Sequence, residues 1–260
     1  MLGDPLAAGA DDLDVGAAIA HWRSHGWARA GVALAADAAA ALGARADDLM
    51  QGRAPIDHLF FQHDAPTGAY DDLEFGKGWV GPSPSYRKIE RLERDPAFRA
   101  WIEHPWIERI ARAIIPGEVA LYRAVLWTKS AAGGMDLPWH QDGGRFWGVD
   151  RQPELTIWTA LDDAPVEAGC VEVIDDSHAG GLATPEGGTI PDRLTANALA
   201  TRLPAARGEV LLLHNLVWHR SGRNRTGVPR RALSVCYMSA DTRCTRTRRA
   251  PRTFERLFTR

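Results

Sequence analysis

A histidine and a carboxylate stand two positions apart in the segment LPWHQDGGRFWG, residues 137–148. His140 and Asp142 follow a run of β-branched and aromatic residues, and side chains at positions i and i+2 of an extended backbone point to one face. One imidazole and one carboxylate are two of the three protein ligands of a 2-His-1-carboxylate site, which suits non-haem Fe(II) and leaves coordination positions open. The spacing therefore predicts a metal centre that needs a second histidine from a distant strand.

His219 is the predicted third ligand, because it ends the strand pattern EVLLLHNLVWH, residues 209–219. If that strand is unbroken, alternation turns the rival His214 to the opposite face. An oxygenase of this kind also needs a cation for the far carboxylate of a 2-oxoacid cosubstrate, and the planar fork of arginine pairs with a carboxylate through two hydrogen bonds. Arg230 and Arg231 begin the next predicted strand, 11 and 12 positions after His219. Arg230 is the predicted anchor, and a one-residue shift would exchange it for Arg231.

The elements that must position these residues differ between the two halves of the chain. The first half carries helical patterns at 14–24, 34–50 and 95–115, the last broken at Pro105, with a short strand after the first and a long loop over 51–86. In the second half, five β-branched and aromatic runs alternate with turn residues, which predicts an antiparallel sandwich or barrel. These runs are EVALYRAVLWTK, LTIWTALDD, GCVEVID, GEVLLLHNLVWH and RRALSVCYM.

The composition indicates a globular protein and argues against several classes of partner. Hydrophobic residues make up 45% of the 260 residues, and the formal net charge of −2 gives no general affinity for nucleic acid or for an anionic membrane. The start of the chain lacks the basic and apolar regions of a signal peptide, and no apolar stretch is long enough to span a bilayer. The three cysteines match no metal-binding spacing and fit buried free thiols. We expect a soluble, cytoplasmic protein that acts on a small-molecule substrate, with its oligomeric state open.

Several segments together resemble the phytanoyl-CoA dioxygenase family, from about residue 88 to residue 238. They are the triplet HQD at 140–142, then IWTALDDAPVEAGCVEVIDDSHAGGL, then RGEVLLLHNLVWHRSGRNRTGVPRRALSVCYM. The resemblance implies a mainly β fold with flanking helices, built on a double-stranded β-helix (jelly-roll, cupin-like) core with an N-terminal helical region. It also implies one Fe(II)- and 2-oxoglutarate-dependent dioxygenase domain over 1–260. Its parts would be a helix-rich N-terminal part at 1–118, a jelly-roll core at 119–240 and a basic C-terminal tail at 241–260.

Matching the motif of the family position by position implies the site residues. The metal ligands would be His140, Asp142 and His219. Arg230 would pair with the 2-oxoglutarate carboxylate, and Ser221 would form a hydrogen bond beside it. Three further residues fall where the family has cosubstrate-side positions: Trp158, Gln141 and Lys88.

Two details of the sequence refine the resemblance. The turn before Ser177-His178 carries Asp175-Asp176 where the family usually has proline-glycine, and we expect His178 to bond to backbone in this turn. An alanine or glycine in place of Asp142 would open a halide site, so the intact carboxylate argues against a halogenase.

Residues on the substrate side are predicted from their position after the first two ligands. Phe146 and Trp147 are candidates to line a substrate pocket, with core packing as the alternative, and Arg145 is a candidate to bind a substrate carboxylate or to lie in solvent. Residues 180–194, GGLATPEGGTIPDRL, are a candidate lid. The last 18 residues contain seven arginines, which form either a solvated basic tail or an anion-binding strip for an acidic substrate.

The resemblance implies the oxidation of an unactivated C–H bond, mainly by hydroxylation, with consumption of 2-oxoglutarate and O2 and release of succinate and CO2. We expect a small-molecule substrate from specialised metabolism. Alternatives within the class are an acyl-CoA thioester or an amino acid as substrate, and desaturation, cyclisation or epimerisation as outcome. Two other interpretations are a zinc hydrolase, which has no need of Arg230, and a catalytically silent jelly-roll binding module, which would be expected to have lost a ligand.

Overall fold

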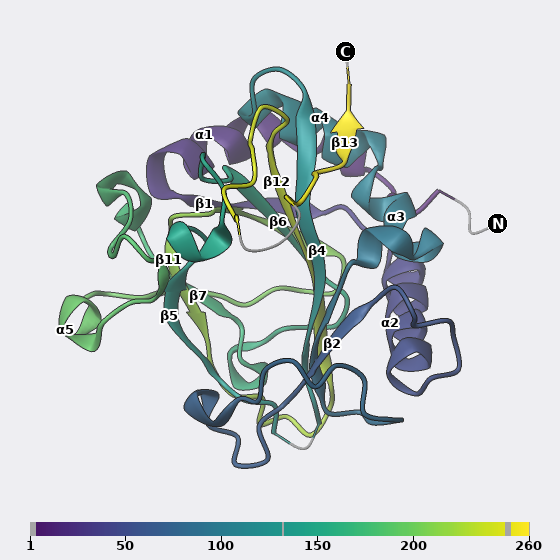
Figure 1. Cartoon of the computed structure of the whole chain (residues 1–260). Coiled ribbons are helices and arrows are strands. Elements are labelled where there is room, and N and C mark those ends of the chain that lie inside the picture. Colours follow the sequence, from purple (N-terminus) through teal and green to yellow (C-terminus); the bar gives the residue numbers. More distant parts are fainter. Residues whose placement is uncertain (1–3, 132, 248–250, 260) are drawn as a thin grey trace.

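The computed structural model describes residues 4–131, 133–247 and 251–259. Two antiparallel sheets enclose the interior of the molecule, and helices cover the outer side of the larger sheet (Figure 1). The order of the larger sheet is β1 (Trp27–Val32), β10 (Glu209–His214), β6 (Leu155–Ala160), β12 (Arg230–Ser239), β4 (Val119–Lys129), β3 (Tyr86–Glu90), β2 (Phe60–His63), with β13 (Arg256–Phe258) also paired to β4. The order of the smaller sheet is β8 (Gly188–Thr189), β5 (Leu137–Gln141), β11 (Trp218–Ser221), β7 (Val171–Ile174), β9 (Thr201–Leu203). This architecture confirms the predicted jelly roll with flanking helices.

The two faces of the larger sheet have opposite character, because side chains alternate along each strand. On β4, Ala124 and Leu126 belong to the main hydrophobic core between the sheet and the helices. The alternate positions of the same strand turn inward, and two of them, Trp127 and Lys129, line the interior cavity. The sheet therefore buries one apolar face for stability and turns the other face, which carries charged groups, toward the site.

Four helices supply the outer half of the main core: α1 (Val15–His25), α2 (Ala36–Met50), α3 (Pro96–Ile102) and α4 (Pro105–Ile114). The Asp14 side chain caps α1 by accepting a hydrogen bond from the Ala17 N–H, and α1 ends at Gly26, which adopts the left-handed conformation that glycine favours. Pro105 opens α4 at the first helical position, where its missing N–H costs nothing. The predicted helices and the break at Pro105 are confirmed.

Two of the predicted elements are wrong in detail. The predicted loop over 51–86 contains β2, a short strand that pairs with β3 at the edge of the larger sheet. The predicted unbroken strand over 209–219 is divided into β10 and β11, which belong to different sheets. Asn215 stabilises the point where the chain passes from one sheet to the other. Its side-chain amide donates to the backbone carbonyl oxygen of Asp142 at 3.2 Å, and its backbone carbonyl oxygen accepts from the Asp142 N–H at 2.8 Å.

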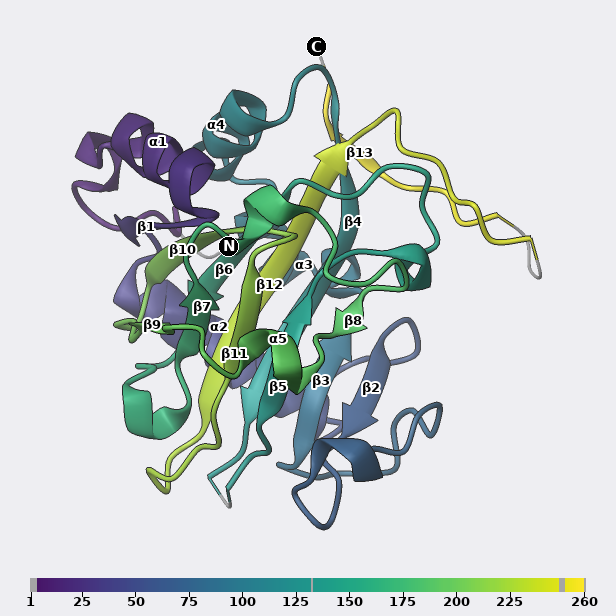
Figure 2. The same ribbon diagram turned by 90° about the vertical axis from the view of Figure 1, so that its left-hand side faces the viewer.

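The described parts of the arginine-rich C-terminal segment are tied to the body at Cys244 and at β13 and extend outward from it elsewhere (Figure 2). The chain leaves β12, bridges Val149 through Cys244, and returns to β4 as β13 with Phe258 buried (Figure 2). The described arginines of this segment, Arg243, Arg246, Arg252 and Arg256, are exposed, as the interpretation as a solvated segment expects, and Arg248, Arg249 and Arg260 lie outside the described residues. The candidate lid is also tied to the body, because β8 pairs with β5 at the register position Thr189 opposite His140.

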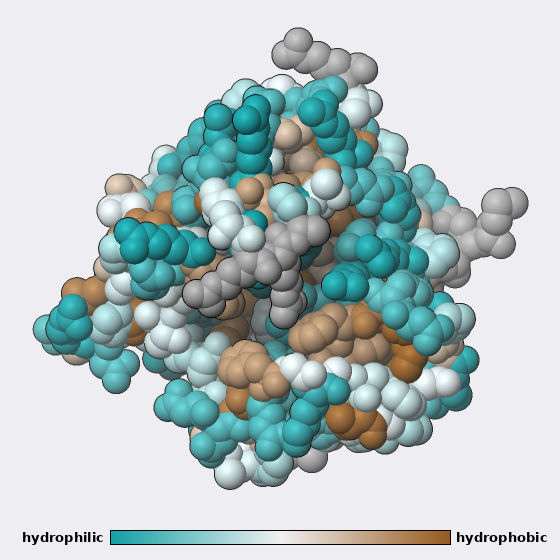
Figure 3. All heavy atoms as spheres, in the orientation of Figure 1, coloured by the Kyte–Doolittle hydropathy of each residue, from teal (hydrophilic) through white to brown (hydrophobic). Residues whose placement is uncertain are grey.

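The surface carries mainly polar groups on the side of the molecule seen in Figure 3, with small separate hydrophobic areas. The exposed apolar side chains include Phe75 and Leu199, which lie in different connecting segments. Within the described residues, no helix combines the length and the apolar character that crossing a membrane requires.

Candidate metal centre

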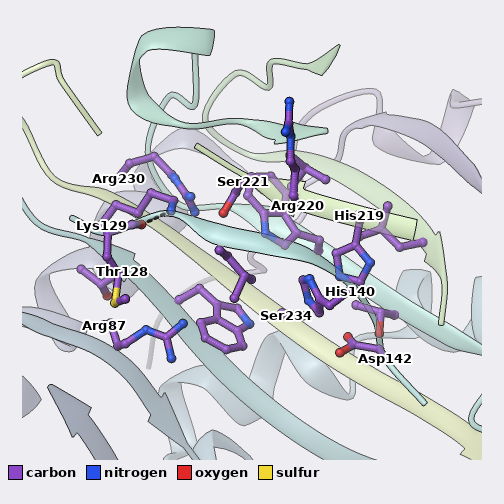
Figure 4. Close-up of a pocket in the computed structure, with 17 residues that line it drawn as sticks. Arg87, Thr128, Lys129, His140, Asp142, His219, Arg220, Ser221, Arg230 and Ser234 are labelled. Atoms are coloured by element: carbon purple, nitrogen blue, oxygen red, sulfur yellow. Dashed lines mark hydrogen bonds between the residues drawn. The ribbon is translucent and has the colours of Figure 1, made fainter. Parts of the chain in front are cut away.

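The two predicted histidine ligands face each other across the pairing of β5 with β11. His140 and His219 are direct register partners, and their ring centroids lie 4.0 Å apart. Asp142 follows the end of β5, and one ligand atom from each of the three side chains lies within 4.8 Å of the others. Figure 4 shows the three groups converging at one end of an interior cavity. The geometry therefore brings together the predicted 2-His-1-carboxylate set.

Backbone carbonyls orient both imidazoles for coordination. His140 Nδ1 lies 2.9 Å from the Pro138 carbonyl oxygen, and His219 Nδ1 lies 3.0 Å from the Val217 carbonyl oxygen. A carbonyl oxygen only accepts, so each Nδ1 carries the proton and each Nε2 keeps a free lone pair. Burial and the neighbouring His219 lower the pKa of His140 to about 3, which keeps this imidazole in the neutral form that binds metals.

Arg123 holds the third ligand in its charged form. Its guanidinium donates to Asp142 Oδ1 at 3.1 Å and lies 4.4 Å from the centroid of the Trp147 ring. Burial alone raises the pKa of Asp142, but Arg123 and the two histidines outweigh this effect and hold the pKa below its usual range. The carboxylate is therefore an anionic ligand, and Arg123 fixes which of its oxygens is left for a metal.

Arg230 lies at the other end of the same cavity and has an unsatisfied donor. The side chain is 3% exposed, its Nη2 donates to the Gly169 carbonyl oxygen at 3.0 Å, and its Nε finds no partner in the part of the chain that the structure describes. Burial lowers the pKa of Arg230 to about 10, so the group stays charged at neutral pH. Ser221, on the same side of the cavity in Figure 4, and Trp158, whose ring centroid lies 6.0 Å from Arg230 Cζ, are among the residues that line it.

Sequence reasoning missed two further cations at this end of the cavity, Lys129 and Arg87. Lys129 is the register partner of Arg230, and its Nζ donates to the Met135 carbonyl oxygen at 2.6 Å. Burial, together with the charges of Arg230 and Arg87, lowers the pKa of Lys129 well below its ordinary value. The signal was present in the sequence, because Lys129 ends a strand whose odd-numbered positions from Arg123 onward turn inward.

The residues present fit an Fe(II) ion at one end of the cavity and a 2-oxoglutarate dianion reaching to the other. Two neutral imidazoles and a carboxylate are the donor set of a non-haem Fe(II) centre. Burying the charged Arg230 with one donor unpaired is costly unless an anion completes its hydrogen bonds.

The family model for phytanoyl-CoA dioxygenase matches residues 22–232. The chain belongs to the phytanoyl-CoA dioxygenase family. A bovine phytanoyl-CoA dioxygenase domain-containing protein 1 is 29% identical over 180 residues, which is 64% of this chain and 61% of the relative. The rat peroxisomal phytanoyl-CoA dioxygenase is 25% identical over 212 residues, 75% of this chain and 62% of the relative. The chain thus spans little more than six tenths of the length of these two curated relatives.

Solved structures of low sequence identity share the fold. The α-ketoglutarate-dependent carbocyclase SnoK from nogalamycin biosynthesis superposes with a TM-score of 0.70 at 19% identity, over 96% of this chain and 97% of that chain. The epimerase SnoN, in a complex described as containing Fe3+, α-ketoglutarate and nogalamycin RO, superposes with a TM-score of 0.68 at 20% identity, over 91% of this chain and 88% of that chain. Family, fold and donor set agree with the predicted class of non-haem iron oxygenase.

Two of the cosubstrate-side positions implied by the family motif lie away from the cavity. The Gln141 amide donates to the carbonyl oxygens of Gly181 at 2.8 Å and Leu216 at 2.7 Å, and its carbonyl oxygen accepts from the Ala183 N–H at 2.7 Å. It therefore anchors the start of the candidate lid. Lys88 forms an ion pair with Glu90 at 2.7 Å and is not among the residues that line the cavity.

The two alternative candidates, Arg231 for the anchor and His214 for the third metal ligand, lie outside the cavity. Arg231 turns to the outer face of the sheet, where it pairs with Asp162 at 2.7 Å and with Asp47 at 2.8 Å. His214 packs against His178, with ring centroids 4.9 Å apart, and accepts from the Leu216 N–H at 3.0 Å. Neither side chain lines the cavity that holds the three ligands.

The predicted substrate-side residues separate into buried and exposed groups. Trp147 is buried and stacks on Tyr122, with ring centroids 4.4 Å apart. Phe146 is 69% exposed, and Arg145 forms a surface ion pair with Glu186 at 3.0 Å. None of the three lines the cavity that holds the metal ligands.

The departure from the family at Asp175-Asp176 has a structural explanation. Asp176 adopts the left-handed conformation with φ 62°, which glycine would favour, and its carboxylate lies 2.8 Å from His25 Nδ1. Ser177 Oγ donates to the Ile174 carbonyl oxygen and accepts from the Trp218 N–H. A ring nitrogen of His178 lies 3.2 Å from the Arg23 carbonyl oxygen, which confirms the predicted backbone bond.

Proposed function

We propose that this protein is a non-haem Fe(II)- and 2-oxoglutarate-dependent dioxygenase that hydroxylates an unactivated C–H bond of a small molecule. A single observation carries the proposal. One interior cavity has the convergent His140, Asp142 and His219 side chains at one end and the buried, incompletely bonded guanidinium of Arg230 at the other. A bifunctional cosubstrate that chelates iron and ends in a carboxylate matches both ends.

The side chains divide the work between binding and exclusion of water. His140 Nε2, His219 Nε2 and the free Asp142 oxygen would hold the iron. Arg230 would pair with the distal carboxylate, because its unpaired Nε and remaining N–H groups form the planar fork that a carboxylate accepts. When bound, iron and 2-oxoglutarate supply the oxidising chemistry, with release of succinate and CO2. Trp158 lines the cavity, with its ring centroid 6.0 Å from Arg230 Cζ, and would keep water from the reacting groups.

The retained ligands and the cation argue against the other two interpretations. A zinc hydrolase would need the same three ligands but has no use for a buried guanidinium across the cavity. A catalytically silent binding module has no reason to keep both imidazoles oriented by carbonyl hydrogen bonds. The oxygenase is the function that uses every one of these features.

The substrate that we propose is a small molecule of specialised metabolism. SnoK and SnoN, which share this fold, are described as enzymes of nogalamycin biosynthesis, and this supports the proposal over an acyl-CoA thioester or an amino acid. Their descriptions as a carbocyclase and an epimerase also show that the fold serves outcomes other than hydroxylation. Analysis of the product by mass spectrometry separates the outcomes, because hydroxylation adds one oxygen atom and epimerisation adds none.

A reducing compartment such as the cytoplasm is proposed on the state of the cysteines. All three, Cys170, Cys236 and Cys244, are free thiols, and the first two are buried. Microscopy of a fluorescent fusion tests this location.

Anaerobic titration with Fe(II) and 2-oxoglutarate tests the metal site. The wild-type protein should develop a visible charge-transfer band, and on exposure to O2 it should release succinate. Asp142→Ala and His219→Ala should lose both signals, whereas His21→Gln, which replaces an exposed histidine on α1, should keep both. Absence of the band and of succinate from folded wild-type protein would refute the oxygenase.

A further inference from the structure

A second cavity of about 730 Å³ opens beside the metal centre. Its walls come from β4, from the 3-10 turn after Arg91, from Trp147 and Gly148, and from Cys244, Arg246 and residues 251–255 of the C-terminal segment. We call it the C-terminal cleft. It meets the metal site at Arg123, which lines the cleft and also donates to the predicted ligand Asp142. A molecule bound in the cleft therefore lies next to the metal centre without occupying the Arg230 end of the inner cavity.

Two arginines of the C-terminal segment are held in place over the cleft. The Arg252 guanidinium lies 4.8 Å from the centroid of the Tyr122 ring and 5.0 Å from that of Phe254, and it donates to the Tyr122 carbonyl oxygen. The Arg246 guanidinium donates to the Phe146 carbonyl oxygen at 2.9 Å. Each guanidinium has five N–H donors, so most donors remain for a ligand. Because the stacked arginine is already ordered, binding through it costs less side-chain entropy than binding through a solvated one.

The positive charge of these arginines is not cancelled by the acidic residues of the cleft. Neither Arg246 nor Arg252 forms an ion pair with a carboxylate among the residues described. Glu90 is paired with Lys88 at 2.7 Å, and Glu255 is paired with Arg99 at 2.6 Å. Burial raises the pKa of Glu93, which disfavours its charged form. The C-terminal cleft thus keeps an excess of positive charge beside the metal centre.

We propose that the C-terminal cleft binds the anionic end of the organic substrate, and that this substrate is a carboxylated or phosphorylated small molecule. Arg246 and Arg252 pair with the oxyanion, and the rest of the molecule extends past Arg123 toward the metal ligands. This proposal rests on the proposed function, since it assigns the substrate class of the same enzyme. Ion pairs within the fold do not account for Arg246 and Arg252, and anion binding gives these two arginines a role.

Direct binding of simple anions tests the proposal without knowledge of the substrate. We would titrate phenyl phosphate, phenylacetate and the neutral phenylacetamide into the protein and measure dissociation constants by calorimetry. At least one of the two anions should bind, and the amide should not. The double variant Arg246→Gln/Arg252→Gln should weaken anion binding by about tenfold or more, because charge-assisted hydrogen bonds are lost. A preference for phenyl phosphate or for phenylacetate distinguishes a phosphorylated from a carboxylated substrate.

Matched variants locate the binding. Arg243→Gln removes an exposed arginine of the same segment that does not line the cleft and should leave anion binding within twofold of wild type. Saturating 2-oxoglutarate under anaerobic conditions occupies the Arg230 end of the inner cavity during these titrations, so that only binding elsewhere is measured. Binding that is lost in Arg243→Gln, that survives in the double variant, or that is equally strong for the amide would overturn the proposal. Thermal melts of each variant show that the fold is retained.

The charge-transfer band that forms with Fe(II) and 2-oxoglutarate distinguishes a failure of this proposal from a failure of the proposed function. The double variant should keep the band, because neither arginine contacts the metal ligands or Arg230. A wild-type protein that binds the anions but gives no band would refute the oxygenase and leave an anion site standing. A wild-type protein that gives the band but binds neither anion would refute the cleft as the substrate site and leave the oxygenase standing.

Discussion

Replacing Arg230 by glutamine should weaken the binding of 2-oxoglutarate far more than it changes the stability of the protein. The guanidinium is 3% exposed, so water cannot readily take its place beside a buried carboxylate. Truncating one partner of a buried, hydrogen-bonded charge pair costs about 2–5 kcal/mol. Lys129 remains next to the carboxylate in the variant, so we expect the lower half of this range, about 2–3 kcal/mol, or roughly 30- to 150-fold weaker binding.

The assay is a titration of the charge-transfer band with 2-oxoglutarate under anaerobic Fe(II). Arg231→Gln is the matched control, because Arg231 is the next residue and points to the outer face, where it pairs with Asp162. The control should keep the dissociation constant of 2-oxoglutarate within twofold. It should lose about 1–3 kcal/mol of unfolding free energy, since Asp162 loses two guanidinium hydrogen bonds but keeps Arg207 at 3.7 Å and the Arg231 backbone N–H. A wild-type dissociation constant in Arg230→Gln, or an equal loss in Arg231→Gln, would refute the assignment of the anchor.

Three further variants test other parts of the account. Lys129→Met should weaken 2-oxoglutarate binding by about tenfold, because it removes one of the buried cations. Burial lowers the pKa of Lys129 in the folded state, so above that pKa the unfolded state binds more protons than the folded state. The stability of the cosubstrate-free wild type should therefore rise with pH relative to that of Lys129→Met. Denaturant melts from neutral to alkaline pH measure this difference. Gln141→Ala should speed proteolysis within residues 180–194, because it removes the side-chain hydrogen bonds to Gly181 and Ala183. The dissociation constant of 2-oxoglutarate should stay within twofold, and a large increase would instead make Gln141 a cosubstrate ligand. Trp101→Ala should lower the unfolding free energy by about 3–5 kcal/mol, since the ring is 2% exposed in the main core and its N–H donates to the Thr159 hydroxyl. A loss below about 1 kcal/mol would contradict this packing.

The local patterns of the sequence predicted most of the elements and the three side chains that the structure brings together as candidate metal ligands. Alternating apolar residues indicated the strands, and capping residues and Pro105 indicated the helix ends. The geometry brings His219 together with His140 and Asp142, but the stated reason for choosing it over His214 failed. The chain crosses from one sheet to the other at Asn215, so His214 and His219 are separated by a change of sheet and not by alternation within one strand.

The remaining features depend on contacts between distant segments, which spacing alone does not encode. Alternation does indicate that Gln141 points away from its neighbours His140 and Asp142, but the family motif placed it beside the cosubstrate. Lys129 was missed because its importance arises from pairing with Arg230 across two strands. The C-terminal arginines were left open because their aromatic partner Tyr122 lies 130 positions before Arg252. Such pairings become visible only when the sheet is assembled.

The most direct test of the central claim is a crystal structure of the protein loaded with Fe(II), with diffraction data collected at the iron absorption edge. We predict an anomalous peak bonded to His140 Nε2, His219 Nε2 and one oxygen of Asp142, the oxygen that Arg123 leaves free. Metal bound elsewhere, or these three side chains pointing apart in the loaded crystal, would contradict the account.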